Sequence, residues 1–235
     1  MTDELDPPGD LRLAIFDIEG TTTSIAFVYD VLFPYARAAI PAFVATRWHD
    51  PEVRFAATLM GADASPEAAI ERALALMDGD VKDTGLKLLQ GLVWADGYGE
   101  GQILGHVYPD VAPAFEALRA RGVTLAIYSS GSVAAQKLIF GRSEAGDLTR
   151  LLSGFFDTTT GPKKIADSYR TIVGCFGVAP ADALFFTDNL DEARAAREAG
   201  LGVRVMRRPG NPPLPAIAAD EAPFVVWDDF TPLLT

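Results

Sequence analysis

The spacing of apolar residues along the chain predicts two kinds of element. Short, nearly continuous apolar runs predict five strands, at residues 11–16, 123–128, 183–187, 202–206 and 224–227. Longer segments with helical spacing precede or separate the later strands, at residues 110–122, 163–177 and 190–200. Buried strands that alternate with helices are typical of a parallel sheet covered on both faces, so we expect an α/β fold with a Rossmann-like sheet.

The region between the first two predicted strands has a different pattern. Residues 24–103 carry helical spacing and no strand-like alternation, and Ser65 followed by Pro66 is a typical helix start. We therefore expect an inserted all-helical cap at 24–103 and an α/β core domain formed by residues 11–23 and 104–235. Residues 1–10 are expected to be a disordered N-terminus.

Composition and charge narrow the possible partners. The chain has 235 residues, of which 49% are hydrophobic, and a net charge of −12 without any basic stripe. Nucleic acid and anionic membrane surfaces are therefore poor partners. No uninterrupted apolar run reaches the ~18 residues that span a bilayer, and no cationic-then-apolar leader is present. We expect a cytoplasmic monomer.

Cysteine and histidine are too rare for several kinds of site. One cysteine excludes an internal disulfide, and two histidines exclude a histidine-rich zinc centre. Cys175 falls in an apolar helical pattern, so we expect a buried thiol.

Two carboxylates follow the first predicted strand directly. In the segment LAIFDIEGTTTSI, residues 13–25, alternation along an extended chain would send Asp17 and Glu19 to the same side. Neighbouring carboxylates repel unless a cation or a shared proton offsets the charge. A solvated acidic turn is the simpler interpretation, but it does not explain why the charges follow a buried strand so abruptly.

Two further loops carry groups suited to an anion. Ser129 and Ser130, in the sequence SSGS, offer hydroxyl and backbone N–H groups after the strand at 123–128, although Ser-Ser-Gly is more often an ordinary turn with a helix cap. Lys163 and Lys164 open a predicted helix in an otherwise acidic chain. A lysine there would supply positive charge to an anionic substrate, although an isolated lysine is more often a surface residue.

Acidic residues also follow the strand at 183–187. Asp191 and Glu192 fall in the first turn of the next helix, where acids usually complement the helix dipole. Asp188 comes before that turn, at the end of the strand, and this explanation does not cover it.

Taken together, these loops predict one site. Ligands of open α/β sheets bind where loops leave the carboxyl ends of strands. We predict that Asp17, Glu19 and Asp188 surround a hard cation such as Mg²⁺, while Ser129 and Lys163 hold a phosphate.

The order of these motifs resembles the haloacid dehalogenase-like phosphatases. Within that superfamily, DIEGTTTSI, YSSGSVAAQKLIFG, FDTTTGPK, SYR and RPGN are similar to the enolase-phosphatases of methionine salvage, over about residues 13–211. Glu19 is the informative position, because most of the superfamily has aspartate there. Asn189 and Asp191 depart from the smaller or apolar residues expected next to Asp188.

The resemblance implies a role for each matching residue. Asp17 would be the nucleophile and a ligand of a single Mg²⁺, and Asp188 the second carboxylate ligand. Glu19 would be the general acid and base, with its backbone carbonyl on the metal. Glu192 would orient the site, and the substrate-binding residues would be Ser129, Ser130 and Lys163.

The resemblance also implies a reaction. Enolase-phosphatases convert 2,3-diketo-5-methylthiopentyl-1-phosphate, by enolisation and then through an aspartyl-phosphate, to the acireductone 1,2-dihydroxy-3-keto-5-methylthiopentene and phosphate. No separate base for the enolisation is evident. Lys163 and His106 are candidates, but a lysine at this position usually binds phosphate in its charged form, and His106 is better interpreted as a hinge or surface histidine. Two alternatives stay open: a phosphatase of the same superfamily acting on another small ester without enolisation, and a non-catalytic metal- or phosphate-binding module.

Overall fold

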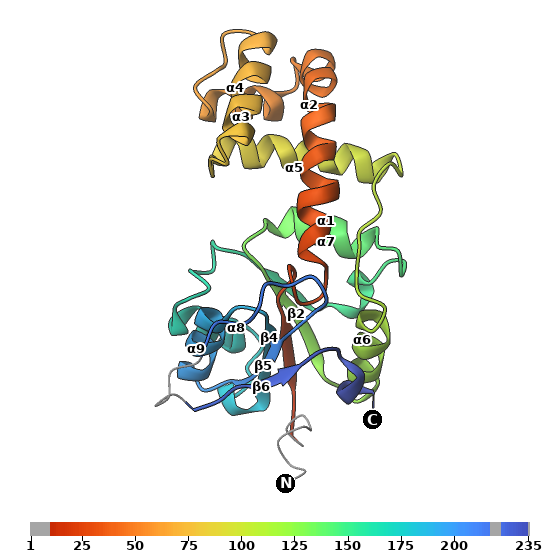
Figure 1. Cartoon of the computed structure of the whole chain (residues 1–235), viewed down its shortest axis with the longest axis vertical. Coiled ribbons are helices and arrows are strands. Elements are labelled where there is room, and N and C mark those ends of the chain that lie inside the picture. Colours follow the sequence, from red (N-terminus) through yellow and green to blue (C-terminus); the bar gives the residue numbers. More distant parts are fainter. Residues whose placement is uncertain (1–9, 217–221, 235) are drawn as a thin grey trace. The chain divides into compact units, whose positions relative to one another are not determined.

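The chain folds into two compact units (Figure 1). The structure is a computed structural model that describes residues 10–216 and 222–234. One unit combines the chain up to Ile25 with the chain from Gly105 onward, and the other is formed by Ala26–Leu104. These boundaries lie within two residues of the expected ones. The disorder expected for residues 1–10 falls, apart from Asp10, outside the described residues.

The first unit is built on a parallel sheet. Within the described residues the strand order is β3-β2-β1-β4-β5-β6, and every pair of neighbours is parallel. The strands are β1 (Leu13–Phe16), β2 (Thr124–Tyr128), β3 (Gly154–Phe156), β4 (Ala183–Thr187), β5 (Gly202–Met206) and β6 (Val225–Trp227). The five predicted strands are present, and the prediction missed β3, a short strand at the edge of the sheet.

Helices cover both faces of this sheet, as expected. In Figure 1, α8 and α9 lie on one side of the strands and α6 on the other. The helices of this unit are α6 (Val111–Ala120), α7 (Val133–Gly141), α8 (Ala166–Cys175) and α9 (Leu190–Glu198), with short 3₁₀ turns at Thr149–Leu151, Pro180–Asp182 and Thr231–Leu233.

Alternation along the strands divides the core between the two faces. Leu13 and Ile15 of β1 belong to the buried cluster that includes residues of α8 and α9. Phe16 points to the opposite face, where its ring stacks on Phe186 at 4.7 Å and meets Phe115 of α6 at 4.8 Å. Because β1 is buried on both faces, it places the residue that follows it, Asp17, at a rigid position.

The second unit is all-helical, and residues 26–104, all of them described, contain no strand. Helix α4 begins as predicted, with the Ser65 side chain accepting a hydrogen bond from Ala68 N at 3.2 Å. The elements are α1 (Ile25–Phe27), a π-helical turn at Val28–Leu32, α2 (Phe33–Arg47), α3 (Pro51–Leu59), α4 (Pro66–Asp78) and α5 (Thr84–Gly99). Their core is buried side chains, among them Ala36, Ile40, Val53, Ala73 and Leu89.

One helical stretch of this region is more apolar than the sequence pattern indicated. Among the described residues, Ile25–Arg47 is long enough to cross a membrane and contains an 18-residue window with a mean hydropathy of 1.3. Four of its side chains, those of Ala36, Ile40, Phe43 and Val44, are buried in the core of the helical unit. A role as a core helix accounts for that composition.

The expectation of a buried thiol is wrong. Cys175 is the last residue of α8, and its side chain is exposed. Its neighbours Ile172 and Val173 occupy the buried face of the helix, which leaves position 175 on the side that faces solvent.

Candidate active site

Asp17 lies where β1 ends and is held there by the backbone. Its N–H donates to the Phe186 carbonyl at 2.9 Å, which continues the β1–β4 ladder by one residue. The chain then turns sharply, because the N–H groups of Thr21, Thr22 and Thr23 all donate to the Ile18 carbonyl. Asp17 is 6% exposed.

The turn separates the two carboxylates that the sequence places together. Asp17 is buried, whereas the side chain of Glu19 is exposed to solvent. The chain is no longer an extended strand after Asp17, so alternation does not fix the side to which Glu19 points. One carboxylate is therefore fixed in the protein and the other is accessible from solvent.

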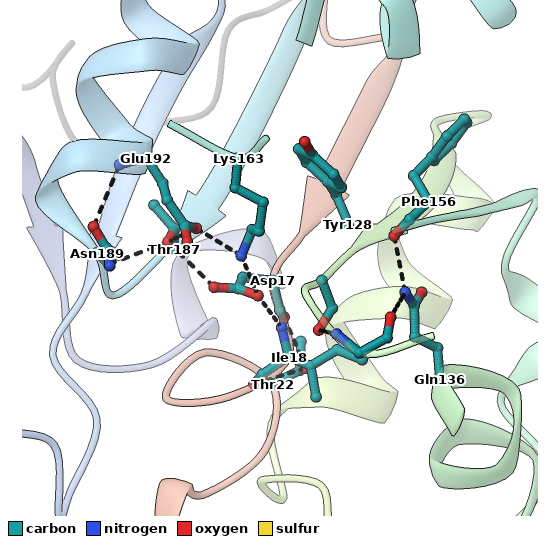
Figure 2. A network of polar contacts seen from close by, with 12 residues as sticks. Asp17, Ile18, Thr22, Tyr128, Gln136, Phe156, Lys163, Thr187, Asn189 and Glu192 are labelled. Carbon is teal, nitrogen blue, oxygen red and sulfur yellow. Dashed lines mark hydrogen bonds and ion pairs between the residues drawn. The ribbon is translucent and has the colours of Figure 1, made fainter. Parts of the chain in front are cut away.

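Lys163 bridges two buried carboxylates (Figure 2). Its ammonium nitrogen lies 2.7 Å from Asp17 Oδ1 and 2.6 Å from Glu192 Oε2. Thr187 completes the group, since its hydroxyl is 3.0 Å from Glu192 Oε2 and 3.4 Å from Asp17 Oδ2. Asp17 and Lys163 lie in loops, Thr187 ends β4 and Glu192 belongs to the first turn of α9, and none of the four is an exposed side chain.

Lys163 is in a loop and not in a helix, which corrects the sequence prediction. Helix α8 begins at Ala166, three residues later. Three hydroxyl groups hold the loop by its carbonyls: Tyr128 donates to Gly161 O, Ser168 to Pro162 O and Tyr169 to Lys163 O, at 2.8, 2.8 and 2.6 Å. The backbone that carries the lysine side chain is thus held in place, and the two ion pairs position its ammonium group.

The charged residues in this group shift one another's pKa values. Burial acts against the charge of Lys163, but the carboxylates of Asp17 and Glu192 outweigh it and raise the pKa of the lysine. Burial, followed by repulsion from Asp17, raises the pKa of Glu192 to about 7. Lys163 is therefore a cation at neutral pH and a poor base.

Asp188 lies at the end of β4, beside the turn that follows Asp17. Burial, and then repulsion from Asp17, raises the pKa of Asp188 to about 7. Gly20 makes the approach possible, because it has a left-handed φ of 68° and a Cβ there would overlap Asp188 Oδ2. Asn211 donates to the Gly20 carbonyl at 2.8 Å and lies 3.4 Å from Asp188 Oδ2.

The serine loop after β2 is also held from several sides. Ser129 is 3% exposed, and its hydroxyl accepts from Gly131 N at 3.2 Å, whereas Ser130 is exposed. Gln136 of α7 donates to the carbonyls of Gly131 and Phe156, both at 2.8 Å (Figure 2). The loop is therefore fixed with one hydroxyl buried and one available to a ligand.

The carboxylates fit Mg²⁺ as a partial ligand set. Among the residues that the structure describes, no group of three or more His, Cys, Asp or Glu side chains is arranged to hold a metal ion. Asp17 and Asp188 form a repelling pair, which a divalent cation would stabilise. Mg²⁺ usually takes one or two protein carboxylates together with water and substrate phosphate oxygens. The exposed side chain of Glu19 does not complete a three-carboxylate cluster, so a part for Glu19 through its carbonyl stays a prediction.

Comparison with known proteins gives this site its class. A family model described as a haloacid dehalogenase-like hydrolase matches residues 11–200, and the chain belongs to that family. Among solved structures, the UTR4 protein of Saccharomyces cerevisiae is similar, with a TM-score of 0.79 and 36% identity, covering 94% of this chain and 99% of that one.

Curated relatives then narrow the class. Enolase-phosphatase E1 of Stenotrophomonas maltophilia strain K279a is 50% identical over 210 residues, which are 88% of this chain and 91% of the relative. Enolase-phosphatase E1 of Pseudomonas aeruginosa strain UCBPP-PA14 is 48% identical over 205 residues, 85% of this chain and 91% of the relative. The resemblance inferred from the motifs is confirmed. Mg²⁺ is the metal that the family generally uses.

Sequence reasoning missed several residues of the site. Thr187 ends β4 and looked like a strand residue, although its hydroxyl lies within hydrogen-bond distance of both Glu192 and Asp17. Gln136 and Asp157 hold the serine loop, Asp157 by accepting from Val133 N at 3.2 Å. Asn211 was visible only as the last letter of the RPGN motif, more than twenty residues from Asp188.

Proposed function

We propose that this chain is a Mg²⁺-dependent bifunctional enolase-phosphatase. It would convert 2,3-diketo-5-methylthiopentyl-1-phosphate to 1,2-dihydroxy-3-keto-5-methylthiopentene and phosphate. The observation that carries the proposal is the buried contact of Lys163 with Asp17 at the carboxyl edge of the sheet, in a chain whose relatives are enolase-phosphatases.

The two oxygens of Asp17 have different surroundings, which suggests how it reacts. Oδ1 accepts from Ile18 N and from Lys163, both at 2.7 Å, whereas the contact of Oδ2 within the described part of the chain is with Thr187, at 3.4 Å. We assign Oδ2 as the nucleophile, because it is less engaged. It attacks phosphorus, the bond from phosphorus to the ester oxygen breaks, and an aspartyl-phosphate forms.

Glu19 is the carboxyl group placed to move protons. It donates a proton to the departing ester oxygen, and it then removes a proton from the water that hydrolyses the aspartyl-phosphate. Its exposed side chain suits a group that exchanges protons with substrate and solvent. We also assign to Glu19 the removal of the substrate proton during enolisation. Lys163 cannot serve as that base, because the neighbouring carboxylates keep it protonated.

Positive charge at the site would come from Lys163 and from a single Mg²⁺. Lys163 holds phosphate oxygens and stabilises the negative charge that develops on them, with Ser129 and Ser130 as further donors. When bound, Mg²⁺ would be held by Asp17, Asp188 and the Glu19 carbonyl, and would offset the charge of the phosphoryl group. Glu192 fixes Lys163 in place.

The remaining parts of the proposal concern the whole chain. We infer that Ala26–Leu104 is the cap that limits access of water during turnover. We also infer a monomer that works in the cytoplasm. Its partner is a small phosphorylated diketone, and neither nucleic acid nor a membrane is part of the proposal.

Product analysis tests the function. The purified chain is incubated with the diketone phosphate and Mg²⁺, while phosphate release and the ultraviolet absorbance of the enol are followed together. We expect an enol signal that precedes or accompanies phosphate, and the loss of phosphate release in excess chelator. Phosphate release from many esters with no enol from any of them would contradict the proposal and indicate a general phosphatase.

A further inference from the structure

The loop after β5, residues 207–211 with the sequence RRPGN, is not used by the proposed reaction. Two of its side chains nevertheless bond the turn that follows Asp17. Arg208 Nε donates to the Thr21 carbonyl and Asn211 Nδ2 to the Gly20 carbonyl, both at 2.8 Å. One loop thus holds two consecutive carbonyls of the turn that carries Glu19.

Asn211 joins this turn to a second strand end. The nitrogen that donates to Gly20 O also lies 3.4 Å from Asp188 Oδ2. The orientation of the amide is fixed by chemistry, because the Gly20 carbonyl can only accept, so the nitrogen must face it. A single amide group therefore connects the turn after β1 with the carboxylate after β4.

The junction at Gly20 leaves little room for movement. A Cβ at this glycine would overlap Asp188 Oδ2 and lie 3.0 Å from Asn211 Nδ2. The three groups are in close contact, and a shift of the amide would be transmitted to the carboxylate.

The loop that carries Asn211 is held in place by Arg208. Arg208 is 4% exposed, and its guanidinium packs on the rings of Tyr108 and Phe230, at 4.6 and 4.4 Å from their centroids. Its Nη1 pairs with Asp110 Oδ2 at 2.7 Å. Asn211 N in turn donates to the Arg208 carbonyl at 3.1 Å. The loop is fixed independently of the carboxylate that it contacts.

We propose that Asn211 is a positioning residue that orients Asp188 for Mg²⁺. Hydrogen bonds donated to a metal-holding carboxylate fix its orientation and favour its charged form. Asn211 Oδ1 is buried and has no hydrogen-bond partner among the described residues, which leaves it available to a bound water. The inference rests on the proposed assignment of Asp188 to the metal.

The test compares two Asn→Ala variants near Asp188, one at its spatial neighbour Asn211 and one at the next residue in sequence, Asn189. Asn211→Ala removes the contact with Asp188, whereas Asn189→Ala removes the cap of α9, where Asn189 Oδ1 accepts from Asp191 N at 2.9 Å. Mg²⁺ alone is titrated into each protein by calorimetry, and melting temperatures are measured in chelator. We expect Asn211→Ala to raise the Mg²⁺ dissociation constant roughly tenfold and to melt a few degrees lower, because the Gly20 carbonyl loses its donor. Asn189→Ala should keep the constant within about twofold and melt a few degrees lower.

Three results would overturn the proposal: wild-type Mg²⁺ affinity in Asn211→Ala, an equal loss of affinity in Asn189→Ala, or no Mg²⁺ binding by the wild-type chain. Asn211→Leu adds a check, because it keeps approximately the shape, adds no charge and cannot donate. A packing role predicts wild-type kcat for this variant, and a positioning role predicts a loss of at least about tenfold. The calorimetric titration needs no substrate, so it decides the inference even if the diketone phosphate is not turned over.

Discussion

Lys163 and Asp17 form a buried ion pair at the carboxyl edge of the sheet, with 2.7 Å between the ammonium nitrogen and Asp17 Oδ1. The same nitrogen lies 2.6 Å from Glu192 Oε2, so one cation is shared by two carboxylates. Together the three side chains carry one excess negative charge when all are ionised. Their balance determines how the site responds to substitution and to pH.

Asp17→Asn should abolish turnover without unfolding the protein. The amide cannot form the phosphoryl-enzyme, whereas Lys163 keeps Glu192 as a partner. We expect kcat to fall by roughly 10³-fold or more, as when other catalytic nucleophiles are removed. Phosphate release and the melting temperature check this. Asp191→Asn, a change at an exposed aspartate, is the control, and retained activity in Asp17→Asn would remove the nucleophile assignment.

Lys163→Met should destabilise the chain strongly. It leaves two buried carboxylates without their cation, which costs about 3–5 kcal/mol in comparable buried pairs. Because the folded-state pKa of Glu192 is raised, the folded variant binds its proton more tightly than the unfolded chain, and stability should recover as the pH falls from 7 towards 5. Urea denaturation at several pH values measures this.

Lys164→Met is the matched control for that variant. Lys164 is 61% exposed and pairs with Asp191 at the surface, so its loss should change the free energy of unfolding by no more than about 0.5 kcal/mol. Equal effects of the two substitutions would contradict the buried bridge.

The metal-free protein should lose stability as the pH rises from acid towards about 7. The pKa of Asp188 is raised from 3.8 to about 7, so the folded chain holds a proton that the unfolded chain has released between these values. The free energy of unfolding then falls with increasing pH, by up to about 1.4 kcal/mol per pH unit for this group. Denaturation in chelator should show this slope, Asp188→Asn should reduce it to the contribution of Glu192, and Mg²⁺ should restore stability at pH 8.

Gly20→Ala should inactivate the site through Asp188. The new methyl group would overlap Asp188 Oδ2, in addition to the strain of about 1–2 kcal/mol from a left-handed φ. Gly122 has a similar φ of 79° with open space around it, so Gly122→Ala carries only the strain. Activity lost in the first variant and kept in the second would confirm the overlap, and equal activity would refute it.

Arg208→Lys should be far more harmful than Arg207→Lys. Arg208 donates hydrogen bonds to Thr21 and Asp110 from different nitrogens, and a single ammonium group cannot reach both acceptors. Arg207 pairs with Asp228 at the surface, where side-chain exposure is 63% and 64%. We expect Arg208→Lys to lower the free energy of unfolding by about 2–3 kcal/mol, and Arg207→Lys to lower it by at most about 0.5 kcal/mol. Chemical denaturation of both variants decides whether the buried guanidinium supports the turn.

The sequence predicted the sheet well, because β1, β2, β4 and β5 each contain four or five buried residues, most of them apolar. It failed at β3, Gly154–Phe156, because three half-buried residues at an edge give too short a pattern. Lys163 was expected on a helix since the apolar spacing of α8 continues backwards through Ile165. The hydrogen bonds of Tyr128, Ser168 and Tyr169 that make the segment a loop join positions that no local pattern connects.

The site was predictable where its residues follow strands. Asp17 and Asp188 could be found because each comes directly after a buried run, and parallel strands end at one edge. Asn211 could not be found in this way, since it lies in a loop five residues beyond β5 and reaches Asp188 across the turn at Gly20. Such contacts depend on tertiary packing and leave no periodic signal.

The chain leaves and re-enters the α/β unit at neighbouring points. Tyr108 N donates to the Thr22 carbonyl at 3.0 Å, and Ser24 N donates to His106 Nδ1 at 3.2 Å. The two ends of the inserted helical segment are therefore joined within that unit. An insertion whose ends already meet can be lengthened, shortened or exchanged with little effect on the sheet. Evolution could therefore change the helical segment to suit new substrates while leaving the residues at the carboxyl edge of the sheet where they are.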